Sequence, residues 1–335
     1  MYEFATGVIN VWEKKILSVL DQERMLKSPN RASAFMVLFD TDLGEIIAEG
    51  SQKNIEDIFS RDLNILKKKL VNILDDKKLL ASFLFLKFDA LNLKSALKKS
   101  FFGKETKNFK PFEFSLEPYK KVESFLKVLL DNNEKSNALT QHCDNFYVRR
   151  LVLEAIQILS SNKEDGQTMD SQMIETAVDR AYLKVRLAMA KKENALPEMV
   201  RLEIDVANLR SLLGKNSQPF LAGGNLASSQ IEKLAQRKEE DLSDNLKIFL
   251  EVLELAFLLD EDHGRNTGIA LEKKLDGYIA KKIFQKEKEK GSGIEKVLAF
   301  FQKKMNSYAN IRLILFAKEN NLPLEEIERA LLPIA

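Results

Sequence analysis

Apolar residues recur every three or four positions along most of this chain, with charged residues between them. Strict alternation of apolar and polar residues, the pattern of a half-buried strand, is scarce. The spacing therefore predicts an all-α fold built from amphipathic helices. The clearest examples are Phe4, Val8, Trp12, Ile16 and Leu20 at intervals of four, followed by periodic runs at 122–133, 145–159, 244–262 and 292–305.

Two stretches interrupt this periodicity and divide the chain into three parts. Glycine, proline and asparagine gather at 101–118 and again at 214–225, and these residues favour turns over helix interiors. A chain of 335 residues also exceeds the size at which one hydrophobic core usually stops growing. We expect three similar helical domains, at 1–112, 113–218 and 219–335.

A short motif recurs once in each predicted domain. The segment DALNLKSAL, from Asp89, and the segment DVANLRSLL, from Asp205, share five of nine residues and exchange Lys for Arg at a sixth. A third copy, SYANIRLIL from Ser307, shares four of nine residues with the second. Each copy contains asparagine, an apolar residue and a base in succession. These triplets are Asn92-Leu93-Lys94, Asn208-Leu209-Arg210 and Asn310-Ile311-Arg312.

A second, acidic segment precedes each triplet. IETAVDRAY at 174–182 resembles LEKKLDGYI at 271–279, and IEDIFSRDL at 55–63 is a looser relative. The glutamate of each segment, at position 56, 175 or 272, precedes the asparagine of the triplet by 33 to 38 residues. A repeat of this length is a unit of two elements, so three copies predict either a pseudo-threefold arrangement or a short array.

The triplets also supply the candidate site residues. On a helical projection Asp89 and Asp205 fall inside the apolar arc of their own copies, and Ser307 takes this position in the third. Because a buried carboxylate is costly without a partner, two interpretations stay open. The acids cap a helix start or pair with a base in the core, or equivalent polar groups line a shared surface on which a partner docks. The candidates are Asp89, Asn92, Lys94, Asp205, Asn208, Arg210, Asn310 and Arg312.

Composition and charge argue against several classes of function. The chain has 52 bases and 50 acids, interspersed, for a net charge of +2, so no basic field favours nucleic acid as a partner. Cys143 is the only cysteine, which excludes an internal disulfide and favours a reducing compartment. We expect no signal peptide. The most apolar run, at 79–86, falls far short of the roughly 20 residues that cross a membrane.

None of the sequence motifs indicates a cofactor-binding or metal-binding site. The glycines of LAGGNL, at 221–226, lack the Lys-Ser/Thr pair of a phosphate loop and indicate a tight turn. The acidic stretch 260–272 misses the glycine and glutamate positions of an EF-hand by one residue each. His142 and Cys143 lack the further ligands of a zinc site or the orienting group of a nucleophile. We therefore expect no cofactor, no metal and no direct nucleotide binding.

Several longer stretches resemble one protein family in the order of its landmarks. The opening YEFATGVINVWEKKILS is similar to the family's first helix, and NRASAFMVLFDTDLGEII at 30–47 resembles its ALxxLxxTxYG stretch, with Leu43 in place of the usual tyrosine. KFDALNLKSALK, RLEIDVANLRSLLG, PFLAGGNL and ANIRLILFAKENNLPLEEIERAL follow in the same order. The family is that of the C subunit, also called the d subunit, of the rotary V-type and A-type ATPases, and the resemblance spans almost the whole chain.

This resemblance implies a fold and a function. Three related helical domains form a pseudo-threefold, funnel-like arrangement in a non-catalytic rotor subunit. Its wide base sits on the membrane proteolipid ring, and its hollow receives the tip of the central shaft. The chain is thus expected to be peripheral, on the cytoplasmic side of the membrane, and to couple ATP synthesis or hydrolysis to proton or sodium transport. The asparagine and base of each triplet match recurring family positions, as rotor contacts or as residues that maintain the repeat.

Two other functions remain open. A generic helical-repeat adaptor would form an open, curved solenoid, whereas a socket closes its three repeats around one hollow. An all-α enzyme would use Asp89 or Asp205 as its base and requires a small pocket where at least two titratable groups converge. Because the spacing supplies no second group, the enzyme ranks below both other functions.

Overall fold

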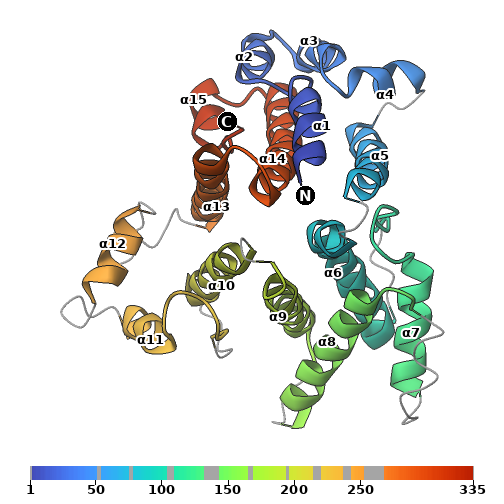
Figure 1. The fold of residues 1–335 in the computed structure, drawn as a ribbon, viewed down its shortest axis with the longest axis vertical. Coiled ribbons are helices and arrows are strands. Elements are labelled where there is room, and N and C mark those ends of the chain that lie inside the picture. The colour runs from blue at the N-terminus through green and yellow to red at the C-terminus, as the bar shows by residue number, and fades with distance from the viewer. Residues whose placement is uncertain are drawn as a thin grey trace. The chain divides into compact units, whose positions relative to one another are not determined.

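Every element of the described chain is helical. The computed structural model describes residues 2–50, 54–74, 78–103, 109–131, 143–164, 169–193, 196–213, 220–236, 243–252 and 268–334. Within these ranges the elements are α-helices apart from one short 3₁₀ helix, η1 (Val37–Asp40), and no strand occurs (Figure 1). The prediction of an all-α fold is confirmed.

The chain divides into two compact units. The first unit combines the two ends of the chain, Met1–Phe59 and Ala195–Ala335, and the second is the continuous segment Ser60–Asn194. Of the predicted domain boundaries, the first falls in a described turn region of the second unit, and 218/219 lies outside the described residues. The division into three domains stays a prediction.

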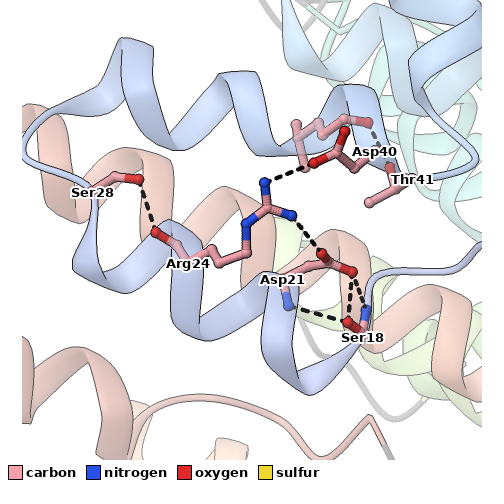
Figure 2. A network of polar contacts seen from close by, with 7 residues as sticks. Ser18, Asp21, Arg24, Ser28, Asp40 and Thr41 are labelled. Carbon is pink, nitrogen blue, oxygen red and sulfur yellow. Dashed lines mark hydrogen bonds and ion pairs between the residues drawn. The ribbon is translucent and has the colours of Figure 1, made fainter.

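The first unit begins with a run of short helices: α1 (Glu3–Glu13), α2 (Val19–Lys27), α3 (Arg31–Met36), η1 and α4 (Gly44–Glu49). Ser18 and Asp21 form a capping box at the start of α2, in which each side chain accepts the backbone N–H of the other. Figure 2 shows how Arg24 extends this network, since its guanidinium donates to Asp21 at 3.1 Å and to Asp40 at 2.7 Å. These contacts tie α2 to η1.

The remaining helices of the first unit are α10 (Leu196–Leu213), α11 (Ser228–Gln236), α12 (Asp244–Val252), α13 (Gly268–Lys290), α14 (Ile294–Glu319) and α15 (Leu324–Arg329). Helix α14 is the central one, because it packs against α1, α2, α3, α13 and α15. Trp12 of α1 lies against Phe300 of α14, with ring centroids 5.8 Å apart. Gly291 and Gly293 join α13 to α14 with φ of +66° and +88°, a left-handed backbone that favours glycine.

The second unit is a bundle around one buried helix. Helix α5 (Ile55–Ile73) begins in the first unit and continues into the second, followed by α6 (Lys78–Phe102), α7 (Tyr119–Asp131), α8 (Phe146–Glu164) and α9 (Ser171–Ala190). Helix α6 packs against α7, α8 and α9, and α8 packs against α9. The guanidinium of Arg186 stacks 3.8 Å above the ring of the buried Phe83. No helix of the described residues is both long and apolar enough to cross a bilayer.

Candidate functional site

The three triplet asparagines share one hydrogen-bonding pattern. Each side chain accepts a backbone N–H through Oδ1 and donates through Nδ2 to the carbonyl of that same residue, later in the chain. An asparagine amide thus pairs with the backbone as a second strand would. The pairs are Asn92 with Phe112 (3.0 and 3.2 Å), Asn208 with Leu221 (2.7 and 2.9 Å) and Asn310 with Leu332 (2.8 and 2.8 Å).

Asp89 holds the same loop as Asn92, one turn away on α6. Its carboxylate accepts the N–H of Leu116 at 2.8 Å and the N–H of Glu117 at 3.0 Å, immediately before α7. Asp89 is fully buried, so these bonds replace the water that a carboxylate would otherwise need. In this structure Asp89 fixes the chain that leads into α7.

Asp205 does the same for α11. Its carboxylate accepts the N–H groups of Asn225 and Leu226, each at 3.0 Å, and the Asn225 side chain adds a third bond at 3.0 Å. A Cβ on Gly224 would lie 2.1 Å from Asp205 Oδ1, so this position must lack a side chain. The prediction that LAGGNL forms a tight turn is confirmed, and the turn wraps around a buried acid.

The third copy has no carboxylate at the position of Asp89 and Asp205. Ser307 donates instead to the carbonyl of Lys303 in its own helix at 2.9 Å. Two side-chain amides hold the corresponding chain segment. Asn310 donates to the carbonyl of Leu332, and Asn306, one turn earlier, donates to the carbonyl of Pro333 at 2.6 Å. Amides are neutral, so the third copy binds its segment without burying a carboxylate.

The triplet bases pair with the acidic segments. Each base reaches the acidic segment of the following copy, and the base of the third copy reaches back to the segment of the first. The pairs are Lys94 with Asp179 at 2.8 Å, Arg210 with Asp276, and Arg312 with Glu56 through two bonds of 2.5 and 2.6 Å. Sequence analysis placed the bases and the acidic segments in separate elements, and the structure brings them together.

The acid of the third pair lies at a different position of the repeat from the acids of the other two pairs. Asp179 and Asp276 occupy one column of the repeat, where the first segment has Ser60, and Glu56 lies four residues earlier. Residues four apart share one face of a helix, so Glu56 presents its carboxylate on the same side. The forked guanidinium of Arg312 engages both oxygens and lies 4.9 Å from the centroid of the Phe59 ring.

Asp89 belongs to a polar cluster with the buried Ser115 and Glu117 and the half-buried Lys67 and Asn145. Lys67 donates to the carbonyl of Ser115, and Glu117 accepts the N–H of Asn145, whose own side chain caps α8. Burial raises the pKa of Asp89 to about 7, against the opposing effects of its two backbone hydrogen bonds and of Lys67. Burial likewise lowers the pKa of Lys67 and raises the pKa of Asp205.

Sequence reasoning missed the two buried lysines of α14. Lys296 contacts Glu13 at 2.5 Å and Glu287 at 2.9 Å, and Lys304 pairs with Asp42. The signal was available, because Lys296 and Lys304 lie four residues on either side of the core residue Phe300 and so share its face. A base in an apolar register indicates a buried ion pair.

Neither acid considered as a catalytic base lies at the cavity that the described residues form. A cavity of about 310 Å³ lies between α10, α12, α13 and α14, yet neither Asp89 nor Asp205 lines it. Two of its charged residues, Glu198 and Lys286, pair with each other. Burial raises the pKa of the Cys143 thiol to about 12, so Cys143 is not a thiolate. Within the described ranges no group of three or more His, Cys, Asp or Glu could hold a metal; His142 and residues 260–267 lie outside them.

Comparison with known proteins identifies the family. The model of the family described as ATP synthase (C/AC39) subunit matches residues 5–330. This chain belongs to that family. The resemblance seen in the sequence is therefore confirmed, and it covers nearly the whole chain, as the order of landmarks indicated.

Two relatives are both named as the C subunit of an A-type ATP synthase. The protein of Methanocaldococcus jannaschii is 22% identical, in an alignment covering 99% of this chain and 86% of the relative. The protein of Methanosphaera stadtmanae is 26% identical over 221 residues, which cover 64% of this chain. That match spans about half the length of the M. stadtmanae protein, 51%. Members of this ATP synthase family are thus similar to this chain along its length.

Proposed function

We propose that this chain is a non-catalytic central-stalk subunit of a rotary V/A-type ATPase. It couples the rotating central shaft to the membrane proteolipid ring during ATP-linked proton or sodium transport. Membership of the ATP synthase (C/AC39) subunit family supports this proposal, as do two relatives named as C subunits of A-type ATP synthases. The chain acts from the cytoplasmic side of the membrane as a peripheral subunit.

One observation carries the mechanical part of the proposal: the triplet bases pair in a cycle. The base of copy one meets the acid of copy two, copy two meets copy three, and copy three meets copy one. An open array would leave a base at one end and an acid at the other without this partner. The cycle supports a closed, pseudo-threefold collar of domains 1–112, 113–218 and 219–335.

A collar that transmits torque must be stiff. The triplet asparagines and the buried acids supply this stiffness, because each one fixes a connecting segment to a helix through two or more hydrogen bonds. Asp89, Asn92, Asp205, Asn208 and Asn310 are all buried. We therefore assign them to the interior of the repeat and place direct rotor contact on exposed residues.

A pull-down of the intact chain from its native membranes tests this function. Central-shaft and proteolipid subunits are expected to come with it in constant proportion. Recovery of the chain without either subunit would overturn the proposal and leave a generic helical-repeat adaptor as the better description. A nucleotide-binding measurement on the purified chain complements it, and we expect no saturable binding of ATP or ADP.

A further inference from the structure

Helix α1 presents an exposed apolar stripe. Phe4 and Val11 are 71% and 61% exposed, and they flank Gly7 on the same face. The opposite face is anchored, since Ala5 and Ile9 are buried and Glu13 pairs with Lys296 of α14. The four most exposed large apolar side chains of the described chain are Phe4, Val11, Leu20 and Met36.

Gly7 has no explanation within the chain itself. A Cβ at this position would meet nothing within 4 Å, and its φ lies outside the left-handed region. Alanine would fit, and glycine in a helix interior is less stable than alanine. A glycine between two bulky residues makes a notch, and such a notch lets a second helix approach closely.

The ends of the stripe are charged. Glu3 lies at its start and Lys14 at its end, both exposed and on the Gly7 face. Among the residues that the structure describes, Lys14 pairs with no carboxylate. A surface complementary to this face is apolar in the middle, with an acid opposite Lys14 and a base opposite Glu3.

We propose that the α1 face formed by Glu3, Phe4, Gly7, Val11 and Lys14 docks an amphipathic helix of the central shaft. This inference rests on the proposed function and adds the surface through which the chain holds its partner. A helix fits because the stripe runs along α1 for about three turns, or roughly 15 Å. Charges at both ends suit a water-exposed shaft helix, whereas a membrane-spanning helix is apolar throughout.

The binding of purified shaft subunits to the full chain tests this surface. A Cβ at position 7 meets nothing within 4 Å, so Gly7→Leu, which fills the notch, is expected to keep the melting temperature and to weaken shaft binding about tenfold or more. Val11→Ala keeps the fold, because Val11 is exposed, and weakens binding severalfold. Lys68→Leu places the same new side chain at an exposed position of α5 and should leave shaft binding unchanged.

A substitution of Lys14 tests the charged end of the stripe. Lys14→Glu is expected to weaken shaft binding severalfold at low salt and to lose most of that effect at high salt. A Lys14→Glu variant with unchanged affinity at low salt would overturn the acidic character assigned to the partner.

The outcomes separate this inference from the proposed function. Failure of the unmodified chain to bind the shaft would refute the function itself. Wild-type binding by Gly7→Leu, with the function intact, would refute only the α1 surface. Two further experiments test whether something else binds the α1 face. Sedimentation tests for a second copy of the chain, and flotation with phosphatidylglycerol vesicles tests for a lipid surface. Loss of self-association or of vesicle binding in Gly7→Leu, with shaft binding kept, would also overturn the proposal.

Discussion

Arg312 and Glu56 are separated by 256 residues, and they form a two-bond ion pair. The guanidinium Nε and Nη2 donate to the two carboxylate oxygens at 2.5 and 2.6 Å, and Phe59 lies beneath the guanidinium. Phe59 in turn contacts Tyr308, with ring centroids 4.4 Å apart. The pair therefore stands on an apolar base that joins α5 to α14.

Breaking this pair should lower stability modestly. Both side chains are about half exposed, so we expect Arg312→Ala to reduce the free energy of unfolding by about 1 kcal/mol, mostly through the lost fork and ring contact. Urea denaturation measures it. Arg312→Lys should recover less than half of the loss, because an ammonium cannot bind both oxygens in the same plane.

The matched control is the exposed pair of Arg329 and Glu325, one turn apart on α15. Arg329→Ala should change stability by less than about 0.5 kcal/mol. A double-mutant cycle on Arg312 and Glu56 should then show a measurable interaction free energy. Additive losses of stability would show that the two side chains do not stabilise the fold through each other.

The paired backbone hydrogen bonds of Asn92, Asn208 and Asn310, here called the asparagine clamp, should each contribute more to stability than the Arg312–Glu56 pair. Asn208→Ala leaves the N–H and the carbonyl of the half-buried Leu221 without their partners, so the expected loss is about 2 kcal/mol. Asn10→Ala, at an exposed position of α1, is the control and should be neutral within about 0.5 kcal/mol. Equal effects of the two substitutions would exclude a structural role for the clamp.

Asp89 should make stability depend on pH. The folded chain holds the Asp89 proton with a pKa of about 7, above its ordinary value of 3.8. Its contribution is therefore fully present below the unfolded pKa and is lost as the pH rises through 7. Between pH 5 and pH 8 the wild type should lose about 2–3 kcal/mol through this group.

Asp89→Asn isolates that effect, since asparagine does not titrate. Denaturation of both proteins at pH 5 and pH 8 should show a smaller pH dependence in the variant. An identical pH dependence in wild type and Asp89→Asn would assign the effect to other groups.

Lys296 should be costly to remove. Burial lowers the pKa of Lys296, but the hydrogen bonds to Glu13 and Glu287 outweigh that effect and leave it raised. Lys296→Ala strands two carboxylates beside each other, and we expect a loss of about 3 kcal/mol at neutral pH. Thermal melting monitors it, with the exposed Lys27→Ala as control. A small loss for Lys296→Ala would show that the two acids find other partners.

Much of this structure could be predicted from the sequence. Apolar spacing predicted the helices, and the repeated triplets singled out Asn92, Asn208 and Asn310 before any partner was known. The partners could not be found in this way, because the clamp closes 20, 13 or 22 residues downstream in the three copies. No fixed interval marks a contact that tertiary packing creates.

The ion pairs show the same limit. The repeat alignment placed Asp179 and Asp276 in one column, yet it could not show that Lys94 and Arg210 reach across to them. Glu56 lies outside that column, and only the shared helix face explains its role. Charge patterning gives the groups that can pair, and the fold decides which of them meet.

Cyclic pairing has a consequence for how such a chain can change in length. Tandem arrays often gain or lose a unit, since each unit interacts only with the next. Here, deletion of the middle copy would remove Asp179 and Arg210 together, so that Lys94 and Asp276 would have to recognise each other across a new junction. Insertion of a fourth copy would separate Arg312 from Glu56. The pair of Arg312 and Glu56 thus ties the last copy of the motif to the first, and a change in the number of copies would have to preserve this contact.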